Sequence, residues 1–304
     1  MGGAATIRPM VDDDLPAVLA IDRAVGWPHE EARFRYLLAD PETRGLVAEV
    51  AGRAVGFAFV GLRGPVGWLG ALAVDPGHQG RGVGAALGRA AEAHFRTSGG
   101  CDTAILEAYE TNRRAIALYD RLGFVVTGVN DLCGTPRGEA PTLPAAGGPG
   151  DGVAREVAPL TEDDLPFLAT LDDAYYGGWR EQDLLYWLGQ GPDLARLLWI
   201  DGQPAGYCLV ERATGRIAPA AAPTLPDFLA LLDAVLGALP AGPDAPPYAA
   251  HLRIADPDAA TLTALAARNL HPVPTLRNVR MEKVYRRPLR RLAGVYASAR
   301  PEKG

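Results

Sequence analysis

Apolar and polar residues along the first 130 positions repeat with two periods, and each period predicts a different element. Short apolar or alternating runs predict strands, because successive strand side chains point to opposite faces. Strands are expected at 6–9, 46–50, 54–60, 66–74, 103–106 and 124–127. Apolar residues spaced three and four apart predict helices after Asp12–Asp14, over 31–38, after Gly82 and over 112–122. This mixture of elements predicts an α/β fold.

The segment 74–87, VDPGHQGRGVGAAL, joins a predicted buried strand to a predicted helix through a glycine-rich turn. The start of a helix carries backbone N–H groups without intrahelical partners and a partial positive charge, so it can bind phosphate. Gly80, Gly82 and Gly84 lack the Cβ atoms that would keep a pyrophosphate away from those donors. An isolated glycine cluster is more often an ordinary loop. No Gly-Lys-Ser/Thr follows, and several strands precede the turn, which disfavours P-loop and dinucleotide-binding folds.

Two motifs in this region resemble those of the GCN5-related N-acetyltransferase (GNAT) family. The first is Gln79-x-x-Gly82-x-Gly84, and the second runs from Asn112 to Tyr119 and continues as RLGF at 121–124. The resemblance extends over residues 4–130. It implies a mixed, mostly antiparallel sheet flanked by helices, and acetyl-CoA as the co-substrate.

The resemblance also implies where acetyl-CoA lies. Pantetheine would run between the fourth and fifth strands, held by backbone groups of the fourth, and the pyrophosphate would lie on the glycine-rich turn. The same backbone groups could stabilise an oxyanion. The residues expected to contact the cofactor are Leu72, Ala73, Val74, Gln79, Gly80, Arg81, Gly82, Val83, Gly84, Ala85, Asn112 and Ala115.

A catalytic acid is implied on the helix of the second motif. Asn112 and Tyr119 are seven residues apart, so two helical turns place them on one face. The resemblance implies that Asn112 contacts the cofactor and that Tyr119 donates a proton to the coenzyme A thiolate. The alternative for Tyr119 is a half-buried tyrosine whose hydroxyl only finds a structural partner. The preceding motif favours catalysis.

The general base is less clearly marked, because the fourth predicted strand carries no carboxylate. Glu107, at the end of the fifth strand, is the nearest candidate, and Glu110 or Glu49 could act through water. Each glutamate could instead be a solvated surface charge, which is the interpretation preferred for Glu110. An amine delivered in its neutral form would need no base. His29 and His78 are interpreted as loop residues, because nothing in the sequence pairs them with a nucleophile.

Together these features predict an acetyl-CoA-dependent N-acetyltransferase that acts on the primary amine of a small molecule by direct attack on the thioester. The loops at 26–31 and 61–67 are expected to select the acceptor, with Trp27 and Glu31 as candidate substrate contacts. Two alternatives are a non-catalytic acyl-CoA-binding regulatory module and a protein N-acetyltransferase. Tyr119 favours an enzyme over a binding module, because a pure binder has no use for a placed acid.

Composition adds limits on partners and location. A net charge of −6 argues against a nucleic-acid partner and mildly favours cationic small molecules. Three cysteines without metal-ligand spacing indicate neither a disulfide framework nor a metal site. No apolar run approaches the ~20 residues of a membrane span, and no signal peptide opens the chain, so a cytoplasmic protein is expected.

The second half of the chain repeats the first at a shift of 150 residues. The matches pair Asp14-Leu15-Pro16 with Asp164-Leu165-Pro166, Asp22 with Asp172, Gly52 with Gly202 and Gly56 with Gly206. A length of 304 residues also suits two domains. We therefore predict a catalytic domain at 1–135, a Pro/Gly-rich linker at 136–152 and a second domain at 153–304.

The second copy lacks both motifs. The stretch 218–226, APAAAPTLP, stands where the phosphate turn is expected, and its prolines remove N–H donors. Ala266 is expected at the position of Tyr119. The arrangement resembles tandem bacterial acetyltransferases with an intact N-terminal and a degenerate C-terminal domain, which implies that only the first domain is catalytic.

Overall fold

The structure of the chain divides into two compact units. It is a computed structural model that describes residues 5–27, 29, 31–144, 153–177, 180–239, 249–289 and 294–297. Among these residues, unit 1 comprises 5–127 and 280–289, and unit 2 comprises 128–279 and 294–297. Each unit is an α/β body with its own strands, its own helices and its own buried core.

Unit 1 is built on a mixed sheet with the strand order β1-β2-β3-β4-β5-β13. Its strands are β1 (Thr6–Pro9), β2 (Thr43–Val50), β3 (Arg53–Arg63), β4 (Val66–Val74), β5 (Thr103–Tyr109) and the end of β13 (Asn278–Val284). Strands β1 to β4 pair antiparallel, whereas β4 and β5 pair parallel. The prediction of a mixed, mostly antiparallel sheet is confirmed.

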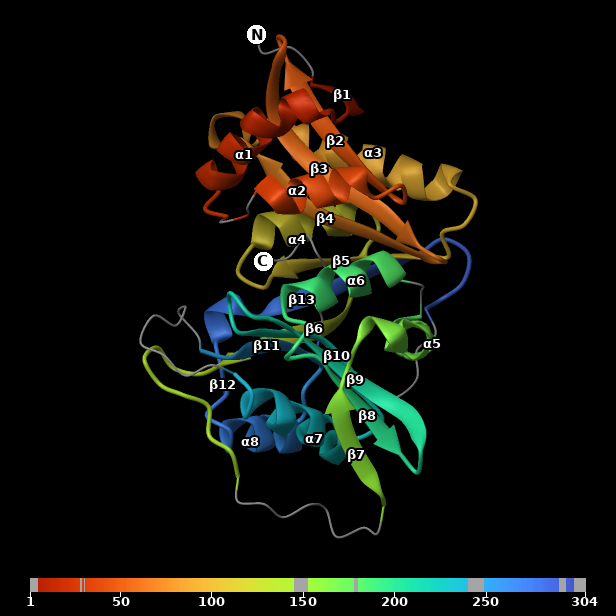
Figure 1. Cartoon of the computed structure of the whole chain (residues 1–304). Coiled ribbons are helices and arrows are strands. Elements are labelled where there is room, and N and C mark those ends of the chain that lie inside the picture. The colour runs from red at the N-terminus through yellow and green to blue at the C-terminus, as the bar shows by residue number, and fades with distance from the viewer. Residues whose placement is uncertain are drawn as a thin grey trace. The chain divides into compact units, whose positions relative to one another are not determined.

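Helices cover both faces of this sheet. They are α1 (Leu15–Ala24), α2 (Glu31–Ala39), α3 (Val83–Thr97) and α4 (Arg113–Arg121), with short 3-10 turns η1 (Asp12–Asp14) and η2 (Pro76–His78). In Figure 1, α1 and α2 cover one face of β2, β3 and β4, and α3 covers the other. The acidic triplet forms η1 instead of the first turn of α1, because the Asp14 carboxylate accepts hydrogen bonds from Val11 N and from Arg8.

Two packing contacts fix the helices on the sheet. On the α1–α2 face, the rings of Phe34 and Phe59 stack with centroids 5.4 Å apart inside a buried hydrophobic cluster. On the α3 face, Gly56 of β3 lets the helix approach closely. A Cβ atom at Gly56 would lie 3.2 Å from Val83 Cγ1 and 3.3 Å from Leu87 Cδ1. The sheet therefore determines where the N-terminus of α3 lies.

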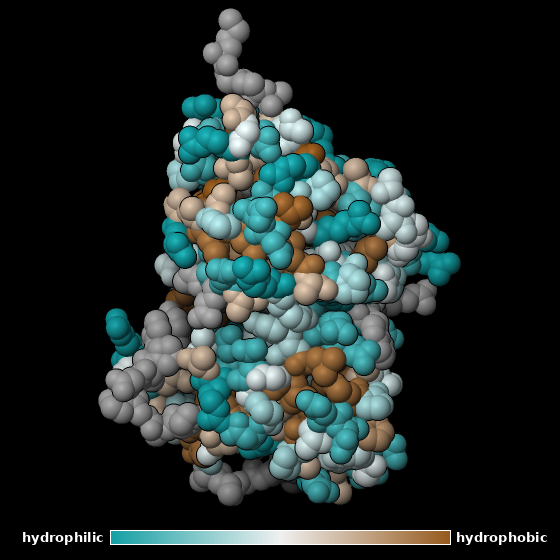
Figure 2. Space-filling model, turned by 45° about the horizontal axis from the view of Figure 1, so that its top comes forward, coloured by the Kyte–Doolittle hydropathy of each residue, from teal (hydrophilic) through white to brown (hydrophobic). Residues whose placement is uncertain are grey.

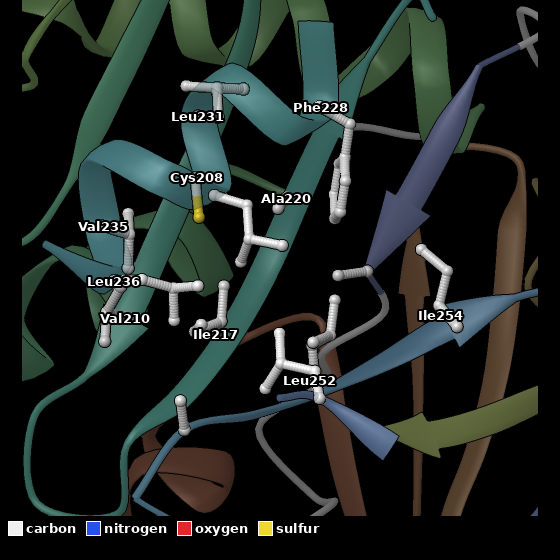
Figure 3. Packing of buried hydrophobic residues seen from close by; sticks show 14 of the residues in the cluster. Cys208, Val210, Ile217, Ala220, Phe228, Leu231, Val235, Leu236, Leu252 and Ile254 are labelled. Carbon is white, nitrogen blue, oxygen red and sulfur yellow. The ribbon is translucent and has the colours of Figure 1, made fainter. Parts of the chain in front are cut away.

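Unit 2 has the strand order β6-β11-β14-β10-β9-β8-β7, and β12 also pairs with β6. Its strands are β6 (Val125–Gly134), β7 (Arg155–Pro159), β8 (Arg196–Ile200), β9 (Gln203–Glu211), β10 (Arg216–Ala222), β11 (His251–Ala255), β12 (His271–Pro272) and β14 (Val295–Ala297). Its helices are α5 (Leu165–Tyr176), α6 (Glu181–Gln190), α7 (Leu225–Leu236) and α8 (Ala259–Ala266), with 3-10 turns η3 (Glu162–Asp164) and η4 (Pro274–Leu276). Figure 3 shows α7 packed on β9, β10 and β11 through Phe228, Leu231, Cys208 and Leu252.

The two units repeat the same order of elements over their first halves. The order β1-η1-α1-α2-β2-β3-β4 recurs as β7-η3-α5-α6-β8-β9-β10. The turn between the second and third strands recurs in its backbone angles. Ala51 and Gly52 have φ of 50° and 74°, and Asp201 and Gly202 have φ of 51° and 74°. The sequence repeat at a shift of 150 residues is therefore also a structural repeat.

Each unit takes one strand from the far side of the predicted domain boundary. Residues 128–134 of β6 pair with β11 in unit 2. In return, residues 280–289 pack in unit 1 beside β5, where Thr103 Oγ1 donates to Arg287 O at 2.6 Å and Tyr285 N donates to Asp102 O at 2.8 Å. The contacts thus divide the chain differently from the predicted domains at these two segments. Unit 1 is incomplete without residues from near the C-terminus.

The described part of the chain contains no helix that is both long and apolar enough to cross a membrane. On the face seen in Figure 2, hydrophilic residues predominate and hydrophobic residues form separate patches among them.

Lys283 anchors the C-terminal segment in unit 1. Its Nζ donates to Glu92 Oε1 in α3 and, at 2.6 Å, to Leu122 O at the end of α4. We expect Lys283→Met to lower the free energy of unfolding by about 1–3 kcal/mol at neutral pH, measured by denaturant titration of the full chain. Arg96 also contacts Glu92 but is 60% exposed, so Arg96→Met is the control and should cost less.

The loss of stability in Lys283→Met should depend on pH in a defined direction. The hydrogen bond from Lys283 is the largest cause of the lowered pKa of Glu92. A carboxylate with a lowered pKa stabilises the fold above its unfolded pKa, and that stabilisation is lost as the pH falls through the folded pKa. The difference between wild type and Lys283→Met should therefore narrow below the ordinary glutamate pKa of about 4.3. Equal losses for the two variants would show that Lys283 is no anchor.

Candidate functional site

Strands β4 and β5 separate after a short paired region. They pair only at Val66–Thr103, Gly67–Ala104 and Trp68–Ile105 among the residues that the structure describes. Both strands continue beyond this point, β4 to Val74 and β5 to Tyr109. The end of β4 therefore has main-chain groups on its β5 side that can pair with an extended ligand, as β-augmentation does.

A β-bulge lies in β4 where the two strands separate. Ala71 and Leu72 of β4 together face the single residue Ala58 of β3. Ala71 has φ of +47°, which is uncommon for a residue other than glycine. Bulges redirect the backbone and often lie beside active sites. The bulge changes the direction of the main-chain groups at the position where the sequence predicts cofactor contacts.

The side chains on either side of the bulge face different helices. A Cβ atom at Gly84 would lie 3.7 Å from Val74 and 3.8 Å from Leu72, so these two side chains face α3. Ala71 and Ala73 belong instead to the hydrophobic cluster beneath α1 and α2. The β4 end thus has a phosphate side, toward α3, and an opposite side, toward α1 and α2.

The glycine-rich turn has the geometry of an anion site. Gly80 and Gly82 have φ of +75° and +84°, and Gly82 is the N-cap of α3 without a side-chain cap. The N–H groups of Val83, Gly84 and Ala85 occupy the first turn, where a helix has no acceptor for them. These donors and the helix dipole suit a pyrophosphate.

The chain itself does not require glycine at position 84. An added Cβ atom would make only ordinary contacts, the nearest at 3.5 Å to Leu118. The glycine is therefore better explained by the approach of something outside the chain. Gln79 braces the turn, because its Nε2 donates to Val74 O at 3.0 Å.

Arg114 adds a positive charge that sequence reasoning did not assign to the site. Its guanidinium lies 3.6 Å from where a Cβ atom of Gly80 would be. The side chain comes from the first turn of α4, two residues after Asn112. Arg114 lies inside the second motif, and this position could have indicated from the sequence that it belongs to the site. Arg81, which was predicted, is exposed on the turn itself.

Asn112 and Ala115 bind each other at the start of α4. The Asn112 Oδ1 accepts a hydrogen bond from Ala115 N at 3.1 Å, which makes Asn112 the N-cap. The backbone donor of Ala115 is thus used within the helix, which weakens the prediction that Ala115 binds the cofactor through this group. The Nδ2 of Asn112 stays a candidate donor.

Tyr119 is buried on the same helix. It is 7% exposed, and its ring meets the Phe124 ring edge-on with centroids 6.3 Å apart. Burial raises the pKa of Tyr119 to about 12, so the hydroxyl keeps its proton at neutral pH. No hydrogen-bond partner of the hydroxyl is found among the described residues. The group can act as a proton donor.

The candidate acceptor residues divide between two locations. Ile105 of β5 packs in the cluster under α1 and α2, and strand alternation places Glu107 on that same face. Trp27 packs against the same cluster. Glu31 lies in the first turn of α2, about half exposed, where it forms an ion pair with Arg35 at 2.6 Å.

His29 lies in the loop before α2, as expected, and its imidazole is paired with a carboxylate. His29 Nδ1 lies 2.7 Å from Asp22 Oδ1, and both side chains are buried. The recurrence of Asp22 as Asp172 in the second half could have indicated from the sequence that this aspartate has a partner. His78 also pairs locally, with Asp75 at 2.9 Å, in the more exposed turn η2.

Among the described residues, unit 2 has no counterpart of the phosphate turn, in agreement with the missing motif at 218–226. Residues 218–222 belong to β10, so only Pro223 and Thr224 connect this strand to α7. Thr224 caps α7 through Asp227 N, and its hydroxyl donates to the Asp227 carboxylate at 2.5 Å. Pro226 lacks an N–H, and a buried aspartate occupies the first turn, so this helix start disfavours phosphate.

The counterpart of Tyr119 in unit 2 is Leu265, not Ala266. Asp258 caps α8 through Thr261 N, as Asn112 caps α4, and Leu265 follows Asp258 by seven residues. The carbonyl of Leu265 accepts from Leu270 N, just as that of Tyr119 accepts from Phe124 N. The position is apolar and fully buried in unit 2. Aligning the two N-caps, Asn112 and Asp258, therefore places a leucine, which cannot donate a proton, at the position of Tyr119.

Residues 12–124 match the model of the acetyltransferase (GNAT) family. The chain is 33% identical over 133 residues to mycothiol acetyltransferase of Salinispora tropica, an alignment that covers 38% of this chain and 42% of the relative. It is 41% identical over 85 residues to that of Thermobispora bispora, covering 26% and 28%. The chain thus spans less than half the length of these relatives.

Two solved structures share the fold over nearly the whole chain. A GCN5-related N-acetyltransferase from Sphaerobacter thermophilus covers 94% of this chain and 97% of its own, with a TM-score of 0.65 and 15% identity. A Pyrococcus horikoshii protein named as an acetyltransferase covers 99% and 96%, with a TM-score of 0.74 and 20% identity. Both likenesses concern the fold.

A substitution in the turn tests the phosphate site. Gly82→Val should weaken acetyl-CoA binding roughly tenfold or more, because a branched side chain at this φ shifts the first-turn N–H donors. Gly52→Val is the matched control, since Gly52 also has positive φ and open space around it but lies in the β2–β3 turn. Calorimetry that shows equal affinity for both variants would contradict the site.

The number of sites can be counted in the same titration. We expect wild-type protein to bind acetyl-CoA once per chain, because the described residues of unit 2 include no such turn, no helix start with free N–H donors next to β10 and no tyrosine at the position of Tyr119. Two equivalent sites per chain would contradict this expectation.

Proposed function

We propose that the protein transfers the acetyl group of acetyl-CoA to the primary amine of a small molecule, because residues 12–124 match the model of the acetyltransferase (GNAT) family. The amine attacks the thioester directly, and the reaction takes place in unit 1. The observation that carries the proposal is the arrangement of the chain between the end of β4 and the start of α3. There a β-bulge, a strand end without a β5 partner and an uncapped helix N-terminus follow one another within about fifteen residues.

The site residues suit such a co-substrate. The first-turn N–H groups of α3, with Arg81 and Arg114 beside the turn, supply donors and charge for a pyrophosphate. Main-chain groups at Leu72, Ala73 and Val74 offer partners for an extended pantetheine chain. Developing negative charge on the thioester oxygen would be stabilised by backbone donors near the bulge.

Tyr119 supplies a proton in this proposal. When the carbon–sulfur bond breaks, the departing thiolate needs a proton, and a buried tyrosine with a raised pKa holds one across the neutral range. Glu107 and Trp27 lie on the opposite face of the sheet end, where an amine would approach. Glu107 gives that side a negative charge for an ammonium group.

Two other functions are less well supported. A module that only binds acyl-CoA would not need a buried tyrosine on the helix beside the phosphate turn. A protein N-acetyltransferase is the other candidate. The relatives of Salinispora tropica and Thermobispora bispora are named mycothiol acetyltransferases, which supports a small-molecule acceptor.

The proposed function is tested by thiol release from acetyl-CoA in the presence of a panel of small amines and an amine-bearing peptide. Tyr119→Phe should lower kcat by about 100- to 10,000-fold on the amine that reacts, and should leave acetyl-CoA affinity nearly unchanged. Tyr186→Phe in unit 2 is the control and should retain full activity. No turnover with any amine, despite tight acetyl-CoA binding, would favour the binding module, and an unchanged kcat in Tyr119→Phe would remove Tyr119 from the mechanism.

A further inference from the structure

The Asp22–His29 pair is a buried acid–imidazole unit that the proposed mechanism has not used. Asp22 lies near the end of α1, and His29 lies just before α2. The side chains are 1% and 7% exposed. His29 Nδ1 donates to Asp22 Oδ1 at 2.7 Å, and the His29 backbone N–H donates to Oδ2 at 3.2 Å. Because a carboxylate can only accept, the proton is on Nδ1, and Nε2 carries the basic lone pair.

The surroundings leave this lone pair available. The Trp27 ring meets the imidazole edge-on at 5.7 Å, and the Phe34 ring lies tilted at 5.6 Å. Asp22 is the charged group found in contact with His29 within the described residues. In that same part of the chain, Nε2 has no hydrogen-bond partner. The arrangement orients an imidazole on one side with a carboxylate and surrounds it with aromatic rings.

A short series of contacts connects His29 to the bulge of β4. The Phe34 ring that touches His29 also meets the Phe57 ring at 5.6 Å, and Phe57 pairs directly with Ala73. Ala71 packs on the same cluster as Trp27. His29 therefore lies on the α1–α2 side of the β4 end, opposite the phosphate side. That is also the face of Glu107.

Unit 2 keeps the carboxylate but pairs it with a different side chain. Asp172, the counterpart of Asp22, is fully buried and accepts from Arg180 Nε at 2.8 Å and from its Nη2 at 2.5 Å. The guanidinium is permanently protonated and cannot accept a proton. Both units thus use a buried aspartate to hold the segment after the first helix. Among the described residues, a proton acceptor is found beside this aspartate in unit 1, which also has the glycine-rich turn and the tyrosine.

We propose that His29 is the general base of unit 1 and that it takes the proton from the ammonium group of the acceptor, with Asp22 as its positioning residue. This rests on the proposed function. One ammonium proton moves to Nε2, and the resulting imidazolium is stabilised by the Asp22 carboxylate. The C–N bond forms and the C–S bond breaks. Nitrogen loses a second proton as sulfur gains one, and His29 returns its proton to water.

This assignment changes the role of Glu107. With His29 as base, the Glu107 carboxylate attracts the ammonium group without taking its proton. Loss of charge at Glu107 should then raise KM for the amine, whereas loss of the base should lower kcat. The two residues are thereby separable in one set of kinetic measurements.

The central variant is His29→Asn, whose side-chain amide can still donate to Asp22 but which has no counterpart of Nε2. We expect kcat/KM for the amine to fall about 100-fold or more, with unchanged Tm and acetyl-CoA affinity. His29→Arg copies the pairing of unit 2 and should lower kcat/KM for the amine to a similar extent. His271→Asn, at an exposed histidine of unit 2, is the control and should keep wild-type kinetics. Full activity of a folded His29→Asn or His29→Arg protein would overturn the assignment.

Two further readouts separate a base from a structural clamp. Imidazole added to His29→Ala should restore turnover in proportion to its unprotonated fraction, which packing alone cannot produce. The acidic limb of the wild-type kcat/KM profile should disappear in His29→Asn. Failure of rescue, together with an unchanged pH profile, would leave only the clamp. Absence of amine acetylation by the wild-type protein would instead refute the proposed function, which is a distinguishable result.

Discussion

The separation of β4 from β5 is the constraint on which the rest of unit 1 depends. Parallel pairing ends at Trp68 and Ile105, and the bulge at Ala71 then redirects the main chain. The same strand end leads directly into the turn that starts α3. Gly56 allows that helix to lie close to the sheet, so the first-turn N–H groups of α3 and the redirected strand are held by one packing contact. A ligand that pairs with the strand end can therefore reach both.

The strand next to β5 comes from the other end of the chain. Residues 280–289 supply it, and Lys283 and Tyr285 attach it to α3 and to the start of β5. Residues 128–134 take the corresponding place beside β11 in unit 2. The exchange makes the integrity of unit 1 depend on residues far away in the sequence. It also means that a cut between the predicted domains would remove part of the sheet that carries the site.

Comparison of the two units distinguishes residues that hold the chain in place from residues that suit the proposed reaction. Both keep the β-turn with positive φ, the buried aspartate of the first helix and a side-chain cap on the last helix, α4 or α8. Within its described residues, unit 2 has no glycine-rich turn between β10 and α7, it carries Leu265 in place of Tyr119, and its buried Asp172 pairs with Arg180 and not with a histidine. The positions that differ are those whose side chains or amides would meet acetyl-CoA or an amine. The positions that persist hold the chain in place.

The sequence by itself determined the class of fold, the repeat, the glycine-rich turn before α3 and the position of Tyr119. These depend on local periodicity, on glycine spacing and on helical register, which neighbouring residues dictate. Tertiary structure decided the rest. Three features depend on where distant segments pair. They are the two-residue connection between β10 and α7, the match of Leu265 to Tyr119, and the strands exchanged between the predicted domains. The Asp22–His29 contact likewise needs a loop folded back onto a helix, and a residue's partner across such a fold is not encoded in the spacing of its neighbours.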